Sequence, residues 1–108
     1  MIITYNKLVR DKIPEIIKES GHKPSTHTAV DAEYKVKLNE KLKEEVEEYL
    51  ESEKNEELAD ILEIIYAICQ LKDLDKRELE EMRKRKAGER GRFDRRIILE
   101  CVEAQEND

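Results

Sequence analysis

The sequence predicts a mainly α-helical fold, a bundle of about four helices built on two long antiparallel central helices. Only 3 glycines and 2 prolines occur among 108 residues, so few positions favour a turn. Apolar residues recur at helical spacing over residues 32–51 and again over residues 56–72. Because 38% of the chain is hydrophobic and 44% is charged, we expect the core to be completed by assembly into an oligomer.

Shorter elements flank the two long helices. A helix over residues 14–20 would begin with Pro14, and a helix over residues 76–87 would end at Gly88. Asp31 is the expected cap of the first long helix, and residues 52–55 form the turn between the two. The β-branched runs 1–5 and 97–102 could add a minor two-stranded pairing of the termini. We interpret residues 1–108 as a single domain.

The composition also argues against several classes of protein. The N-terminus lacks the pattern of a secretory signal, and no apolar run approaches the roughly 20 residues of a membrane span. Cys69 and Cys101 lie in apolar contexts without CxxC spacing, which predicts buried, reduced thiols. We therefore expect a cytoplasmic protein with no membrane partner.

Charge is strongly segregated along the chain. Residues 31–82 hold eighteen acidic and eight basic side chains, whereas residues 83–96 hold two acidic and eight basic ones. The acidic stretch EEVEEYLESEKNEELAD, residues 44–60, lies between the two apolar helical patterns. The acidic and basic side chains are therefore not spread evenly over the chain, and both segments are candidate functional regions.

The second long helix carries two apolar seams, which predicts burial on two sides, by its own domain and by a partner subunit. Extending one seam backwards by four residues reaches Glu57, and Asp60 lies on its flank. A carboxylate at the end of such a seam is partly desolvated, which is costly unless it is paired or bound to metal. The seams are Leu58, Leu62, Ile65 and Cys69, and Ile61, Ile64, Ile68 and Leu71.

A hairpin that turns after Ser52 would place acids of the two helices at equal heights. Glu48 would face Glu57, and Glu45 would face Asp60 one turn further along. Four converging carboxylates repel one another, and a hard divalent cation such as Mg²⁺ would keep them ionised. The alternative is that these acids are solvated and pair with lysines, namely Lys41, Lys43 and Lys54.

These residues resemble the all-α NTP pyrophosphatase superfamily, which includes MazG-like enzymes, dimeric dUTPases and phosphoribosyl-ATP pyrophosphohydrolases. Its EExxE and ExxD motifs match EEVEE at 44–48 and ELAD at 57–60. The opening YNKLVRDKIPEI and the closing RGRF, at 5–16 and 90–93, are similar to those of small phosphoribosyl-ATP pyrophosphohydrolase-like proteins. Two features depart from the pattern: only eight residues separate Glu48 from Glu57, and Arg92 replaces a more usual glycine.

The resemblance implies a Mg²⁺-dependent nucleotide pyrophosphohydrolase, with Mn²⁺ as a substitute. It would cleave between the α and β phosphates to give a monophosphate and pyrophosphate, which suits a house-cleaning role. From the composition and the two apolar seams we expect a homodimer or homotetramer. The metal ligands implied are Glu45, Glu48, Glu57 and Asp60. Glu44 would be an auxiliary acid near the metal or its water, so that Glu44 and Glu45 are the candidate catalytic residues.

Basic residues supply the candidate contacts to the nucleotide, because lysine and arginine neutralise phosphate charge. The competing reading is a non-catalytic helical module that binds nucleic acid, or only assembles, through residues 83–96. Phe93 is the only aromatic residue in that segment, which disfavours stacking on single strands. The candidate substrate-binding residues are Asn6, Lys7, Arg10, Lys12, Lys84, Arg90 and Arg92.

Overall fold

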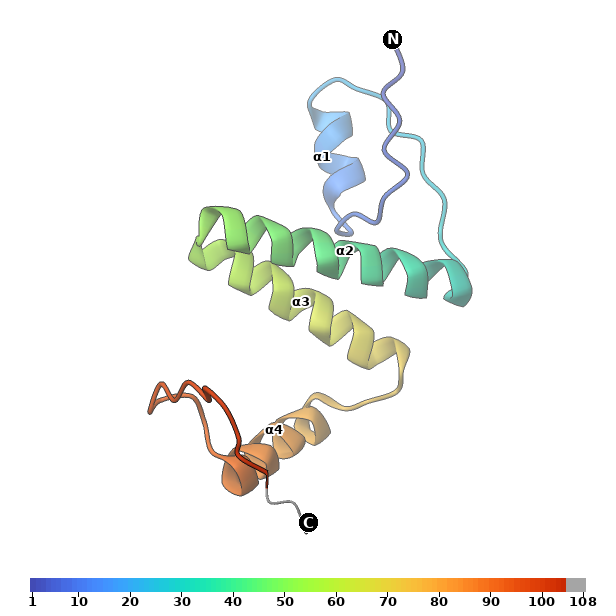
Figure 1. The fold of residues 1–108 in the computed structure, drawn as a ribbon. Coiled ribbons are helices and arrows are strands. Elements are labelled where there is room, and N and C mark those ends of the chain that lie inside the picture. Colours follow the sequence, from blue (N-terminus) through green and yellow to red (C-terminus); the bar gives the residue numbers. More distant parts are fainter. Residues whose placement is uncertain (105–108) are drawn as a thin grey trace. The chain divides into compact units, whose positions relative to one another are not determined.

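A computed structural model describes residues 1–104 of the chain and contains four α-helices within them. The helices are α1 (Ile13–Glu19), α2 (Asp31–Ser52), α3 (Asn55–Leu71) and α4 (Lys76–Arg90) (Figure 1). The mainly α-helical prediction is confirmed, and the two central helices are the longest elements. The chain forms two compact units, Met1–Asp75 and the part that begins at Lys76.

Helices α2 and α3 pack against each other as an antiparallel hairpin with a very short turn (Figure 1). Glu53 follows α2 in the left-handed conformation, with φ 55°, and its N–H donates to the Tyr49 carbonyl at 2.7 Å. Lys54 is extended, with ψ 142°, and α3 begins at the next residue. The chain therefore reverses within two residues, where the sequence predicted the turn.

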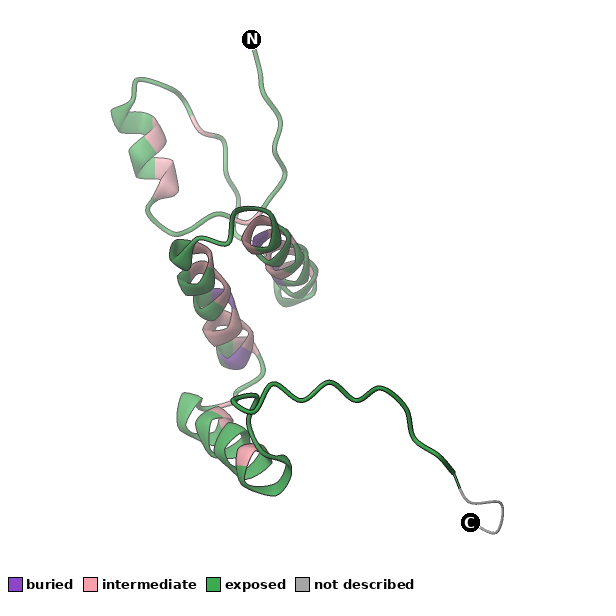
Figure 2. Ribbon diagram, turned by 60° about the vertical axis from the view of Figure 1, so that its left-hand side comes forward, coloured by how far each residue is buried: buried purple, intermediate pink, exposed green. Residues whose placement is uncertain are grey.

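The interior of the first unit is small and contains a charged residue. Among residues 1–104 the buried side chains are Leu38, Ile64, Cys69 and Glu45, all on α2 and α3 (Figure 2). Ile64 belongs to one predicted seam of α3, and Cys69, at the end of the other seam, is also buried. The rest of that second seam leaves Leu58 48% and Leu62 47% exposed, so within residues 1–104 it is only partly buried.

The segment before α1 is tied to α2 by a side-chain hydrogen bond and to α1 by a backbone hydrogen bond. Lys37 on α2 donates from Nζ to the carbonyl of Asn6 at 2.8 Å. The Arg10 carbonyl accepts from the Ile13 N–H at 3.0 Å, where α1 begins, and Pro14 lies in the first turn of that helix. Residues 6–13 are therefore held between α2 and α1, which positions their basic side chains.

The expected pairing of the two termini is wrong. Neither residues 1–5 nor residues 97–102 form a strand, and the structure has no strand anywhere in residues 1–104. A lone two-stranded ribbon is marginal in water, so β-branched composition alone does not stabilise one. Cys101 is exposed in this irregular tail, which corrects the prediction of a buried thiol, whereas Cys69 is buried and free as predicted.

Two helix boundaries also differ from the prediction. Val30, in an extended conformation, occupies the position before α2, so Asp31 is the first helical residue and not the cap. Gly88 lies within α4, which continues to Arg90 and ends at Gly91 with φ 87°. The Gly91 N–H donates to the Ala87 carbonyl at 2.9 Å, so the second glycine, not the first, ends the helix.

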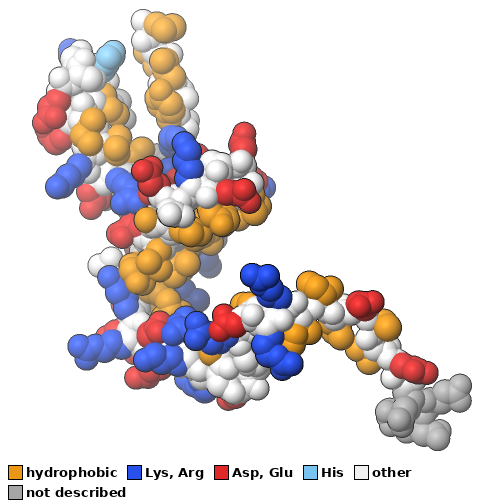
Figure 3. Space-filling model, turned by 90° about the vertical axis from the view of Figure 1, so that its left-hand side faces the viewer, with side chains coloured by type: hydrophobic (Ala, Val, Ile, Leu, Met, Phe, Trp, Pro, Cys, Tyr) orange, Lys and Arg blue, Asp and Glu red, His pale blue; other side chains and the backbone are white. Residues whose placement is uncertain are grey.

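The second unit is polar along α4 and apolar in the segment that follows it. Helix α4 has no buried residue, and the following segment exposes Phe93 at 96% and Ile98 at 81% of their surfaces. Figure 3 shows hydrophobic side chains, in orange, along the segment after α4. No helix within the described residues has both the length and the apolar character that a membrane crossing requires.

Leu38 is the main apolar anchor of the hairpin, since it is only 2% exposed. We expect Leu38→Ala to lower the free energy of unfolding by about 2–5 kcal/mol, because it leaves a cavity between α2 and α3. Leu99→Ala is the matched control: Leu99 is 76% exposed, and its loss should change stability by less than about 0.5 kcal/mol. Chemical denaturation measures both, and equal effects would contradict this packing.

Candidate metal centre

The hairpin brings the acidic residues of its two helices together next to the turn. Glu45, Glu57 and Asp60 each offer a carboxylate oxygen, and these three atoms lie within 4.8 Å of one another. Glu44, Glu45 and Glu48 form a second such group, again within 4.8 Å. Glu45 is common to both groups, so the four predicted acids and Glu44 form two overlapping groups, and Glu48 does not belong to the group that contains Glu57 and Asp60.

Glu45 is the unusual member of this acidic cluster, which we define as Glu44, Glu45, Glu48, Glu57 and Asp60. Its surface is only 7% exposed, although glutamate is rarely buried without a partner. One oxygen, Oε1, lies 3.3 Å from Lys41 Nζ. The other, Oε2, is buried and finds no hydrogen-bond partner within the described structure.

The electrostatic environment works against ionisation of two of these acids. Burial is the main cause that raises the pKa of Glu45, and the neighbouring Glu48 carboxyl adds to it, although Lys41 opposes the shift. Burial also raises the pKa of Glu57, with further contributions from the negative charges of Glu45 and Asp60. A cation placed among these oxygens would relieve both the repulsion and the desolvation.

The donor set fits a hard divalent cation. All the converging atoms are carboxylate oxygens, which Mg²⁺ and Mn²⁺ prefer, and no thiol or imidazole belongs to either group. The orphaned Oε2 of Glu45 is an independent sign, because a buried acceptor without a partner is costly to keep. Exposed acids alone would give no such indication, and Glu47 in the same motif is indeed exposed.

Cations from the opening segment border the acidic cluster. Arg10 donates from Nη2 to Asp60 Oδ1 at 2.8 Å, and Lys7 Nζ lies 3.8 Å from Glu44 Oε1. Both were predicted to bind phosphate, and both lie beside the carboxylates. Of the other two predicted residues in this segment, Asn6 accepts from Lys37 through its backbone, and Lys12 is exposed just before α1.

Lys41 was expected near the acids only in the alternative that pairs them with lysines, and not among the candidate site residues. It approaches Glu44 at 3.7 Å and Glu45 at 3.3 Å, with a side chain only 19% exposed. The signal was available, because residues three and four apart on a helix are neighbours. The alternative reading that paired the acids with lysines is therefore correct for Lys41, but this pairing leaves Glu45 Oε2 unsatisfied.

The remaining predicted cations, Lys84, Arg90 and Arg92, belong to the second unit and are exposed. Arg92 Nε lies 3.7 Å from Asp94 Oδ2, which is a weak surface contact. On α4, Arg83 makes a tighter pair with Glu80, at 2.6 Å from Nη2 to Oε1, and this pair lowers the pKa of Glu80. A role for these cations in substrate binding stays a prediction.

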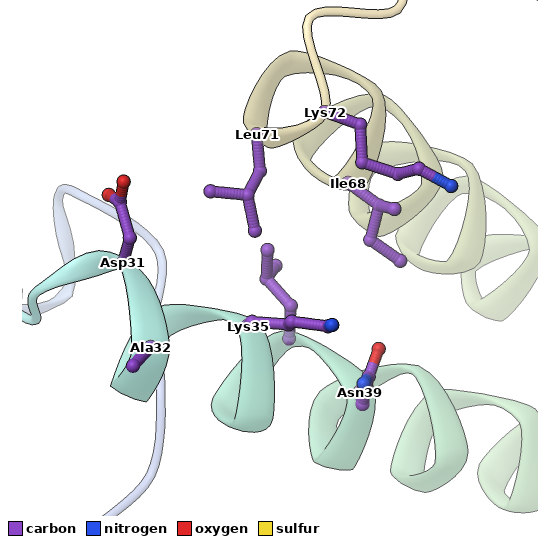
Figure 4. Close-up of a pocket in the computed structure, with 8 residues that line it drawn as sticks. Asp31, Ala32, Lys35, Asn39, Ile68, Leu71 and Lys72 are labelled. Carbon is purple, nitrogen blue, oxygen red and sulfur yellow. The ribbon is translucent and has the colours of Figure 1, made fainter.

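A pocket of about 470 Å³ lies toward the other end of the hairpin, between the start of α2 and the end of α3. Ile68 and Leu71 extend from α3 toward α2, and Asp31, Lys35 and Asn39 line the opposite side (Figure 4). It contains none of the predicted site residues. The acidic cluster, and not this hollow, is therefore the candidate site.

Comparisons with known proteins assign no family to this chain. No protein-family model matches it, and no solved structure matches it. An uncharacterized protein of Mycolicibacterium smegmatis is 52% identical over 42 residues, which is 39% of this chain. The match spans 43% of that protein, so this chain covers less than half of its length.

The raised pKa of Glu45 gives a stability prediction with a definite sign. The folded state holds this proton more tightly than the unfolded state, so stability falls as pH rises from 4.5 through the raised folded value. We expect Glu45→Gln to stabilise the metal-free protein at pH 7 by about 1 kcal/mol, since it removes a buried charge. The gain should vanish below pH 4.5, where the carboxyl is protonated in both states.

Denaturant unfolding at several pH values, without divalent cations, measures this effect. Glu47→Gln is the control, since Glu47 is exposed on the same helix and should change stability by less than about 0.5 kcal/mol. A loss of stability at pH 7 for Glu45→Gln would show that the folded protein favours the ionised group even without metal.

Proposed function

We propose that this protein is a Mg²⁺-dependent nucleotide pyrophosphohydrolase that cleaves between the α and β phosphates and releases a monophosphate and pyrophosphate. One observation carries the proposal: a buried glutamate oxygen without a partner, Glu45 Oε2, within an acidic cluster that spans two helices. The resemblance of the two acidic motifs and the opening segment to the all-α NTP pyrophosphatases adds the reaction and a house-cleaning role.

The residues divide naturally between the metal and the substrate. Glu45, Glu48, Glu57 and Asp60 would hold the ion, which supplies Lewis-acid polarisation of phosphate and a more acidic bound water. Glu44, with a side chain 37% exposed, lies at the border of the cluster, where it can accept a proton from an attacking water.

The bordering cations would neutralise and orient the phosphates. Arg10 and Lys7 come from the opening segment, which hydrogen bonds to α2 and α1 hold in place. A guanidinium presents two parallel donors to phosphate oxygens, and an ammonium supplies a compact charge. Lys84, Arg90 and Arg92 are proposed as further phosphate contacts because of their charge and the RGRF resemblance.

We further propose that the protein works as a homodimer or homotetramer in the cytoplasm. Exposed apolar residues lie on both long helices. On α2, Val46 is 38% and Leu50 is 70% exposed. On α3, Leu58 is 48% and Leu62 is 47% exposed. Figure 3 shows orange hydrophobic side chains at the surface of this helix pair. Both cysteines are free, which fits a reducing compartment.

Replacing the ligands on α3 tests the proposed reaction. Glu57→Gln and Asp60→Asn should each lower Mg²⁺-dependent pyrophosphate release by about a hundredfold or more, because each removes a charged metal ligand without changing shape. The measurement is pyrophosphate production across a panel of nucleoside triphosphates and phosphoribosyl-ATP, with and without Mg²⁺.

Glu47→Gln serves as the matched control, because Glu47 shares the acidic motif of α2 but is exposed away from the cluster. Full activity in the Glu57 and Asp60 variants would contradict the assignment. If no nucleotide is cleaved and the chain instead binds nucleic acid in a salt-sensitive way, the basic 83–96 segment is the functional element.

The proposed assembly is tested by placing a charge on the exposed apolar face. Leu62→Glu should dissociate the oligomer, because a carboxylate buried in a subunit contact is strongly disfavoured. Sedimentation velocity measures the mass, and Leu99→Glu, in the exposed tail, is the control that should leave it unchanged. A wild-type protein that sediments as a monomer would contradict this part of the proposal.

A further inference from the structure

Arg10 forms an ion pair with Asp60, and the proposed metal would bind the same carboxylate. Its Nη2 lies 2.8 Å from Asp60 Oδ1. A carboxylate oxygen of Asp60 also lies within 4.8 Å of ligand oxygens of Glu45 and Glu57, which a single cation could contact together. A guanidinium and a divalent ion that both contact the Asp60 carboxylate would repel each other. Each cation therefore weakens the binding of the other to this carboxylate.

The Arg10 side chain can leave this position while its backbone stays in place. The side chain is 58% exposed, so it forms a surface ion pair of the kind that contributes little stability. Its carbonyl accepts from the Ile13 N–H at 3.0 Å, and Lys37 donates to the Asn6 carbonyl at 2.8 Å. The guanidinium can therefore swing while its attachment to α2 and α1 holds it near the cluster.

The neighbouring lysines are less suited to such an exchange. Lys41 is part of α2 and its side chain is only 19% exposed, so it stays beside Glu44 and Glu45. Lys7 lies 3.8 Å from Glu44, at the limit of an ion pair, and it lacks the two-pronged donor geometry that fits phosphate. Arg10 alone among the three combines a direct contact, an exposed side chain and a fork of donors.

We propose that Arg10 is a tethered, exchangeable counter-ion of the acidic cluster. It neutralises Asp60 when no metal is present, and metal binding displaces it toward an anion that the metal has recruited, such as a substrate phosphate. Arg10 is thus a positioning residue that couples metal loading to phosphate binding. This inference rests on the proposed function, because it takes the cluster to be a metal site and the ligand to be a phosphate ester.

The exchange predicts effects of opposite sign from one substitution. Arg10→Gln should tighten Mg²⁺ binding by about two- to fivefold, since a competing charge is removed. The same variant should weaken binding of inorganic pyrophosphate to the Mg²⁺-saturated protein by about tenfold, since a charged hydrogen-bond donor is lost. A purely structural role would weaken both affinities.

Isothermal titration calorimetry measures both affinities without any turnover. Lys18→Gln is the control, since Lys18 pairs with Glu15 on α1, and it should leave both affinities unchanged. Arg10→Lys keeps the charge, so Mg²⁺ affinity should stay near the wild-type value while pyrophosphate binding weakens in part. Melting curves of every variant establish that the fold is retained.

The outcomes separate this inference from the proposed function. If wild type binds Mg²⁺ but Arg10→Gln leaves its affinity unchanged or weakens it, the exchange is overturned and the metal site stands. If the exchange is observed but no nucleotide is cleaved, the proposed activity fails and the exchange stands. If wild type binds no Mg²⁺, both are overturned.

Discussion

The first unit is organised around a buried carboxylate, that of Glu45, which is removed from water. Glu45 is one of four buried side chains among residues 1–104, beside Leu38, Ile64 and Cys69, and its Oε2 has no partner there. A buried, incompletely paired carboxylate opposes folding, and a core this small can offset little of that cost. The arrangement is understandable if the position serves a ligand, because functional sites are where proteins retain unfavourable local interactions.

The hairpin turn determines which acids meet. Glu53 adopts a left-handed conformation, so α2 and α3 reverse direction within two residues and keep a fixed register. One more residue in α3 before Glu57 would rotate the acids of that helix by about 100° relative to those of α2. The opening segment then supplies Arg10 and Lys7 at the border of the cluster. Opposite charges are thus concentrated at one end of a single helix pair.

The central part of this architecture was predictable, because helical periodicity and a short turn determine it locally. The seam through Ile64 and the equal heights of Glu45 and Asp60 follow from 3.6 residues per turn. The β-branched residues 1–5 and 97–102 gave a wrong prediction of strands, because strand formation depends on a pairing partner and not on composition alone. Arg10 at Asp60 could not be predicted, because that contact joins residues fifty apart through an irregular segment. Lys41 was named only as a pairing lysine, and its i, i+4 spacing to Glu45 is what makes that pair local.

Anomalous scattering from a crystal soaked in Mn²⁺ tests most directly whether Glu45 Oε2 is a metal ligand. We expect a peak bonded to Glu45 Oε2 and to oxygens of Glu57 and Asp60, at about 2.0–2.3 Å. A map with Mn²⁺ only at exposed carboxylates, and a water molecule hydrogen-bonded to Glu45 Oε2, would contradict it.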